Sequence, residues 1–164
     1  MITVRRAAPG FANWQGLLDL ILSSFAPMDG RVAPPSSANR LTTDRLRKRA
    51  AEEVLFLAHK QQHLLGCVFA RPEPDHIYLG KLAVAPGHQG IGIGGHLVGL
   101  VQDMGRNAGL PVVLETRIEL VENHAAFAKM GFVKTNETAH LGYERATSIT
   151  MEWRVPLFAP QIRD

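Results

Sequence analysis

The sequence holds its most chemically informative residues in a glycine-rich segment, residues 86–95 (PGHQGIGIGG). Backbone N–H groups can converge on a ligand where no Cβ atom blocks them, so repeated glycine favours a binding loop. A helix that begins directly after such a loop also directs the positive end of its dipole at the ligand, which suits phosphate. Because glycine inside a helix costs about 1 kcal/mol, a flexible turn alone does not explain the repetition. The segment therefore predicts a phosphate-binding loop.

Two motifs compete for these residues. Gly90, Gly92 and Gly95 satisfy G-x-G-x-x-G, and Glu115 follows Gly95 by 115 − 95 = 20 residues, as in a dinucleotide-binding fingerprint. This interpretation predicts an NAD-dependent oxidoreductase. It is weakened because residues 86–89 separate the first glycine from the preceding strand, and because the earlier strands have the pattern of hairpins. The other motif is Q/R-x-x-G-x-G/A, which residues 89–94 satisfy. A P-loop is excluded, since no Gly-Lys-Ser/Thr follows.

The elements around the loop are predicted from hydrophobic periodicity and from Gly and Pro breaks. We expect strands at residues 2–7, 54–60, 63–71, 76–85, 112–118, 132–138 and 147–154, and helices at residues 11–25, 43–53, 92–108 and 123–130. Residues 27–40 are expected to form a mobile loop. The order β-α-α-β-β-β-α-β-α-β-β predicts a mixed α/β fold with one largely antiparallel central sheet flanked by helices. We expect one domain at residues 1–155 and a tail at residues 156–164.

Several of these features resemble the GNAT-type N-acetyltransferase superfamily. The strand at residues 82–86 (LAVAP) ends in the family's V-x-P, and Gln89 follows at the expected spacing. A short helix beginning at Asn123 ends in residues 127–132 (FAKMGF), which are similar to the family's Y-x-x-x-G-F. The element order agrees as well. The resemblance is strongest between about His76 and Phe132.

The resemblance implies a single acetyltransferase domain that moves an acetyl group from acetyl-CoA to a primary amine in a ternary complex. It places the coenzyme in a V-shaped opening between the strands at residues 76–85 and 112–118, with its pyrophosphate on the glycine loop. In the family a backbone N–H of the first of these strands polarises the thioester carbonyl, and here that donor is assigned to Leu82. The implied coenzyme-binding residues are Leu82, Ala83, Val84, Gln89, Gly90, Ile91, Gly92, Ile93, Gly94, Gly95, Asn123 and Phe127.

The catalytic side chains are less defined. The family commonly uses a tyrosine of the last short helix to protonate the leaving thiolate, and this chain has Phe127 there. Glu115, His76 and Tyr78 are candidate bases, of which Glu115 is preferred because a partly buried carboxylate can have a raised pKa. The alternative for Glu115 is a surface ion pair with Arg117 or a lysine.

Two further side chains each have two alternative roles. Tyr143 could donate the missing proton from its loop, or it could be a surface residue. Asn123 could contact the pantetheine arm, or it could serve as a helix N-cap. Because Phe127 removes the usual acid, a CoA-binding sensor or structural domain without turnover stays open as the alternative function.

Composition excludes several classes. With 20% charged and 46% hydrophobic residues in 164, wholesale disorder is excluded, and no apolar run approaches the roughly 20 residues of a membrane span. The single Cys67, expected in the core, excludes an internal disulfide, and the seven histidines show no metal-ligand pattern. A net charge of +3 without a basic stripe suits a small anionic ligand better than nucleic acid.

The N-terminal residues and two loops predict the cellular location and the acceptor-binding walls. The N-terminal residues are too polar for a signal peptide, so a cytoplasmic protein is expected. The acceptor, a small-molecule or peptide amine, would lie against residues 25–40 and 140–145, where neutral-to-basic walls would suit a carboxylate. The resemblance also allows a homodimer.

Overall fold

The computed structural model describes residues 1–156. The strands are β1 (Ile2–Arg6), β2 (Val54–Lys60), β3 (His63–Pro72), β4 (Ile77–Val84), β5 (Val112–Arg117), β6 (Val133–Thr138) and β7 (Ser148–Trp153). The α-helices are α1 (Trp14–Phe25), α2 (Thr43–Glu52), α3 (Ile93–Ala108) and α4 (Val121–Lys129), and two 3₁₀ helices, η1 (Ala26–Met28) and η2 (Ser37–Arg40), lie between α1 and α2. The predicted order of strands and α-helices is confirmed.

All seven strands belong to one sheet, in the order β1-β2-β3-β4-β5-β7-β6. Within residues 1–156, β4 and β5 are the one parallel pair, and α3 connects them. The other neighbouring strands are antiparallel. The predicted mixed α/β fold with a largely antiparallel sheet is therefore confirmed.

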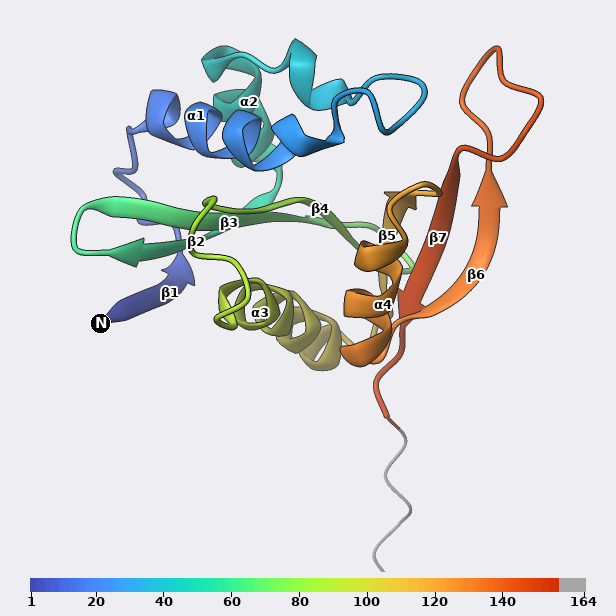
Figure 1. Ribbon diagram of the computed structural model, residues 1–164. Coiled ribbons are helices and arrows are strands. Elements are labelled where there is room, and N and C mark those ends of the chain that lie inside the picture. Colours follow the sequence, from blue (N-terminus) through green and yellow to red (C-terminus); the bar gives the residue numbers. More distant parts are fainter. Residues whose placement is uncertain (157–164) are drawn as a thin grey trace, which may run out of the picture.

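Helices cover both faces of the sheet, which gives the molecule two apolar cores (Figure 1). Leu17, Ile21 and Leu46 of α1 and α2 pack on one face, and residues of α3 and α4 pack on the other. Neighbouring residues of the central strands alternate between the two cores, as Leu55 and Phe56 of β2 do. Burial on both faces explains why β2 and β3 are nearly continuous apolar runs.

The sheet opens between β4 and β5. These strands pair only at Ile77 with Val112 and at Tyr78 with Val113. Beyond this point β5 continues alongside β7 as far as Arg117, while β4 stays beside β3 (Figure 1). The remaining residues of β4 therefore have no partner on β5 among those described.

Helix α2 begins at residue 43, as predicted, after the N-cap residue Thr42. Two other helix starts differ from the prediction by two residues or more. Helix α1 begins at Trp14 rather than at residue 11. Helix α4 begins at Val121 with Leu120 as N-cap, so the N-cap role considered for Asn123 is wrong. Among the described residues, no side chain caps this end of α4, and the helix includes two residues before Asn123, the polar residue at which its start was predicted.

The segment between α1 and α2, expected as a mobile loop, crosses to the far half of the sheet and is fastened there. The Arg31 guanidinium contacts the Glu122 carboxylate of α4 at 2.6 and 3.2 Å. From β5, Arg117 donates to the Pro34 carbonyl at 2.7 Å and to the Pro35 carbonyl at 3.2 Å. The segment therefore bridges the opening between β4 and β5. We call residues 31–37 the strap.

The prediction of one domain at residues 1–155 with a tail at residues 156–164 stays a prediction. Of the tail, residues 157–164 lie outside the described residues.

Two glycines of α3 offer a matched test of the packing of this helix. A Cβ at Gly105 would lie 2.7 Å from the Leu110 carbonyl oxygen and 3.0 Å from Val112 Cγ2, whereas a Cβ at Gly99 would meet nothing within 4 Å. We expect Gly105→Ala to lower the free energy of unfolding by about 1–3 kcal/mol through overpacking. Gly99→Ala should raise it by about 0.5–1 kcal/mol, because alanine restricts the unfolded chain. Urea unfolding of both variants tests this. Equal effects would contradict the close approach of α3 to β5.

Candidate active site

A cavity of about 910 Å³ lies where β4 and β5 diverge. Its walls come from both strands, from α4, from the segment between α1 and α2, and from the loop after β6. The lining includes Phe25, Met28, Pro34, Pro35, Ser36, Ser37, Asn39 and Arg40 on one side, and His140 and Leu141 on another. Both stretches expected as acceptor walls therefore contribute to the cavity.

The glycine loop connects β4 to α3, and its backbone is open. Gly87, Gly90 and Gly92 have φ angles of 88°, 79° and 95°, a region that side-chain-bearing residues rarely adopt. A Cβ added to any of them would meet nothing within 4 Å. The loop is thus shaped by its glycines, and its N–H groups are reachable from outside.

The N-terminus of α3 has no side-chain cap. Gly92 is the N-cap residue, and no side chain accepts a hydrogen bond from the first turn within the described structure. The first N–H groups of a helix lack intrahelical partners and carry the positive end of its dipole. Gln89 turns the other way, since its amide donates to the Val84 carbonyl at 3.2 Å and so ties the loop to β4. This end of α3 can accept an anion.

The predicted coenzyme residues divide into exposed and buried ones. Gly90, Ile91, Gly92 and Gly95 are exposed, whereas Ile93 and Ala83 are buried and can offer only backbone atoms. The exposed residues of this loop thus lie at the surface beyond the end of β4, while Ile93 packs into the core. Leu82 lies on the cavity side of that strand.

β4 is irregular at the residues facing the cavity. Lys81 has a φ of 51°, and the register with β3 shifts here, leaving Lys81 and Leu82 without a partner residue. A bulge of this kind turns backbone groups away from the ladder. The Val84 N–H is held differently, because it donates to the Ser24 hydroxyl at 3.3 Å. Lys81 and Leu82 therefore lie outside the ladder with β3, and both line the cavity.

Glu115 and Tyr78 both line the cavity, and His76 does not. Glu115 is exposed on β5, so the partial burial on which its role as a base was predicted is wrong, and the exposed position of the alternative is correct. The ion pair with Arg117 or a lysine that this alternative also expected does not occur among residues 1–156. Burial, followed by the Glu115 charge, raises the pKa of the Tyr78 phenol. Tyr78 is therefore poorly suited as a base. His76 is paired with Asp75 at 2.7 Å, before β4 begins.

Helix α4 supplies the wall opposite β4. Asn123, in its first turn, and Phe127 line the cavity. Phe127 is 8% exposed, and its ring packs edge-on against Phe132 with centroids 5.8 Å apart. The residue at the family's tyrosine position therefore reaches the cavity, but it brings no hydroxyl. Tyr143 lies outside the cavity lining, although His140 and Leu141 in the same loop are part of it.

Sequence reasoning missed the cationic side chains of the cavity. Lys81 stands alone in the apolar run of β4, and its ammonium donates to the Ser37 hydroxyl at 2.8 Å. Burial, with nearby arginines, lowers the pKa of Lys81 to about 8. A lone lysine inside an apolar strand was the signal available in the sequence.

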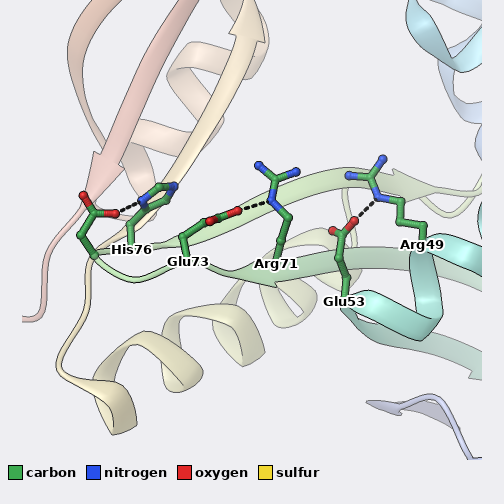
Figure 2. A network of polar contacts seen from close by, with 6 residues as sticks. Arg49, Glu53, Arg71, Glu73 and His76 are labelled. Carbon is green, nitrogen blue, oxygen red and sulfur yellow. Dashed lines mark hydrogen bonds and ion pairs between the residues drawn. The ribbon is translucent and has the colours of Figure 1, made fainter.

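Arg49 of α2 also lines the cavity. The Arg49 guanidinium lies close to Gly80, where an added Cβ would be 2.7 Å from it. Figure 2 shows Arg49 joined to Glu53, and Arg71 joined to Glu73 farther along the sheet. These pairs run beside the cavity, so two of its arginines are balanced by carboxylates.

Cys67 is fully buried, as expected, and burial raises the pKa of its thiol to about 12. His59 and His63 lie on either side of the β2–β3 turn. Within residues 1–156 no group of three or more His, Cys, Asp or Glu side chains could hold a metal ion. In that same part of the chain, no helix has the length and apolar character of a bilayer span.

Known structures share this architecture. A GNAT family acetyltransferase from Elizabethkingia anophelis, solved with acetyl-CoA bound, aligns with a TM-score of 0.68 and 20% identity over 94% of this chain and 98% of that one. The Escherichia coli ribosomal-protein-S18-alanine N-acetyltransferase aligns with a TM-score of 0.72 and 14% identity over the whole of both chains. PaiA N-acetyltransferase from Thermoplasma acidophilum, solved with coenzyme A, aligns with a TM-score of 0.72 and 15% identity over 94% of this chain and 99% of that one.

At these identities the structures show a shared fold. No curated protein matches the sequence significantly. The model of the acetyltransferase (GNAT) family matches residues 14–132, which is most of the chain and includes the glycine loop, β4, β5 and α4. The resemblance seen in the sequence is thereby confirmed, and the chain belongs to the acetyltransferase (GNAT) family.

Proposed function

We propose that the protein transfers the acetyl group of acetyl-CoA to a primary amine, with both substrates bound together. One observation carries this proposal: an uncapped, glycine-lined helix N-terminus lies at the end of a strand that separates from its parallel neighbour. The loop can hold the two phosphates, and the opening can hold the reacting groups. Solved structures of the same fold from two organisms contain acetyl-CoA or coenzyme A.

The loop residues fit a pyrophosphate. Gly90, Gly92 and Gly95 leave the space around their backbone free of side chains, and the first turn of α3 supplies N–H donors together with the helix dipole. Residues 89–95 contain no lysine or arginine, so the amides would do the binding. The dinucleotide alternative is not favoured, because the sheet around this loop is antiparallel except at β4 and β5.

The amide-rich pantetheine arm would lie along β4 in the opening, where residues 79–84 have no partner on β5. At the bulge, the Leu82 N–H would donate to the thioester carbonyl oxygen and stabilise the charge that develops there. Asn123, which faces the same cavity from α4, would hydrogen-bond the arm. Positioning two bound reactants can then supply much of the rate.

The chemistry requires two proton losses from the acceptor ammonium. One proton leaves before attack, the amine nitrogen forms a bond to the carbonyl carbon, and the carbon–sulfur bond breaks. The second proton leaves the nitrogen, and the CoA thiolate takes up a proton. Glu115 would accept the first proton, directly or through water. Tyr143 or solvent would protonate the thiolate, because Phe127 has no hydroxyl.

Turnover is tested with purified protein, labelled acetyl-CoA and a pool of amines. A labelled amide would support the enzyme. Saturable coenzyme binding without any product would support the alternative, a CoA-binding sensor. A small-molecule or peptide acceptor, a homodimer and a cytoplasmic location stay predictions.

The phosphate loop is tested by Gly92→Asp. The change adds a Cβ at a φ of 95° and a negative charge where the pyrophosphate would lie, and losing charge-assisted hydrogen bonds should weaken CoA binding on the order of 10- to 100-fold or more. Gly109→Asp is the matched control, because Gly109 also has a positive φ and open surroundings but lies at the other end of α3. Calorimetric titration with CoA measures both. Unchanged affinity in Gly92→Asp would place the phosphates elsewhere.

The base is tested by Glu115→Gln. Glutamine keeps the shape and removes the proton acceptor, so kcat should fall on the order of 100-fold, the lower end of what a positioned base contributes. The KM for acetyl-CoA should stay within about two-fold. Glu52→Gln, an exposed change on α2, is the control. A Glu115→Gln enzyme with parental kcat would assign proton removal to water or to another group.

The acid is tested by Phe127→Tyr. A phenol at this position could protonate the thiolate, since its ordinary pKa is near 10. We expect CoA affinity to stay within about two-fold, and turnover to be at least that of the parent and up to ~100-fold higher. Stopped-flow measurement of free thiol checks this. Loss of CoA binding in this variant would show that residue 127 does not flank the thioester.

A further inference from the structure

The cavity between β4 and β5 is strongly cationic. Among the described residues, its lining contains five cationic side chains and one carboxylate, Glu115. The cations come from α2, η2 and the three central strands, so the fold gathers them from distant parts of the sequence. They are Arg40, Arg49, Arg71, Lys81 and Arg117.

Two of these charges are balanced within the protein. The Arg49 guanidinium lies 2.8 Å from the Glu53 carboxylate, and that of Arg71 lies 2.6 Å from the Glu73 carboxylate (Figure 2). Both carboxylates are largely or partly buried, with side chains 7% and 32% exposed. These pairs account for part of the positive charge.

The other three cations have no carboxylate partner in the part of the chain that the structure describes. Lys81 donates to the Ser37 hydroxyl, and Arg117 donates to strap carbonyls such as that of Pro34 at 2.7 Å. These neutral oxygens fix the two side chains and use only some of their donors, since an ammonium has three and a guanidinium five. With Arg40, they form what we call the cationic trio.

The trio is crowded. The pKa of Lys81 falls to about 8, first because of burial and then because of the charges of Arg49, Arg117 and Arg40. Glu119 lies near Arg117, but its carboxylate accepts from the Ala33 N–H at 3.3 Å in the strap. An anion among the three cations would relieve this repulsion.

We propose that the acceptor is a small amine that also carries an anionic group, a carboxylate or a phosphate, which binds between Lys81, Arg117 and Arg40. This rests on the proposed acetyl transfer, and it names the class of acceptor. The geometry supports a short molecule, because Lys81 directly precedes Leu82, the proposed donor to the thioester carbonyl. Amine and anion would then be separated by few bonds, as in an amino acid. A peptide N-terminus has no carboxylate beside its amine unless an acidic side chain supplies one.

The acceptor class is tested with matched amines in a free-thiol assay with acetyl-CoA. Amino acids are compared with their carboxamides, O-phosphoethanolamine with ethanolamine, and peptides beginning with Asp or Glu with their Asn or Gln counterparts. We expect at least one small acid to exceed its neutral partner about 10- to 100-fold in kcat/KM, the range of one or two charge-assisted hydrogen bonds. The amino-acid and phosphate pairs show which anion is recognised.

Three outcomes would overturn the proposal. Equal or faster acetylation of the neutral partners would refute the anionic acceptor while leaving acetyl transfer intact. Acetylation of peptides alone would refute the small acceptor in the same way. No acetylation of any amine would refute the proposed function, and the acceptor class with it.

The site is tested by Lys81→Met, which keeps the apolar stem and removes the charge. KM for the preferred anionic amine should rise about ten-fold or more, and the preference for acid over amide should fall to about three-fold or less. KM for acetyl-CoA should stay unchanged, Lys81→Arg should restore much of the preference, and the exposed change Lys60→Met should have no effect. A Lys81→Met enzyme that keeps the full acid preference would contradict the site.

A titration gives a readout besides turnover. The pH dependence of lysine acylation, followed by mass spectrometry, reports the apparent pKa of Lys81 in the parent protein. The preferred anionic amine, added without acetyl-CoA, should raise this pKa by about one unit or more, since an adjacent anion favours the ammonium. Its neutral partner should not, and an unmoved pKa would contradict anion binding at the trio. The groups that face the Lys81 ammonium are Arg49 of α2, Arg40 of η2, Arg117 of β5, the Ser37 hydroxyl and the Phe25 ring of α1.

Discussion

The two-residue pairing of β4 with β5 is the constraint on which the rest of the structure depends. Ile77 and Tyr78 join the two halves of the sheet, and beyond them β4 must satisfy its backbone polar groups without β5. Buried backbone donors and acceptors are rarely left unpaired, so a strand that separates from its neighbour inside a fold needs other partners. Here the bulge at Lys81 turns the chain, and the Val84 N–H finds the Ser24 hydroxyl. The backbone N–H and C=O groups of β4 that have no partner among the described residues are the ones that a substrate can bind.

An open sheet needs support from outside it. Helix α3 connects the two strands, and its close approach at Gly105 brings it against Val112 of β5 and Trp153 of β7. On the opposite face the strap spans the opening, and Arg117 and Glu122 hold it on the β5–α4 side. Local geometry therefore opens the cleft, and contacts between residues far apart in the sequence connect its two sides.

The sequence predicted what depends on local pattern. The strand at residues 54–60 was predicted with its observed bounds, and the helix after the glycine loop to within one residue, because apolar periodicity and glycine act over a few residues. The start of α4 was missed, because Leu120 and Val121 carry no capping signal. The cationic trio and the strap were missed for another reason. They depend on contacts among η2, β4 and β5, which are far apart in the sequence. A pattern that extends over a few residues does not predict such contacts.

The two ends of the cleft treat negative charge differently, and the difference suits the proposed reaction. At the glycine loop, amides and a helix dipole would hold phosphates without any cationic side chain nearby in sequence. At the other end, Lys81, Arg117 and Arg40 supply full charges. Burial and positive charges both lower the pKa of an ammonium. Burial first, and then the charges of Arg49, Arg117 and Arg40, lower the pKa of Lys81 within the cavity to about 8. An acceptor amine placed here would meet the same burial and whatever positive charge its own anionic group does not neutralise, and both would favour the neutral nucleophile that acetyl transfer requires.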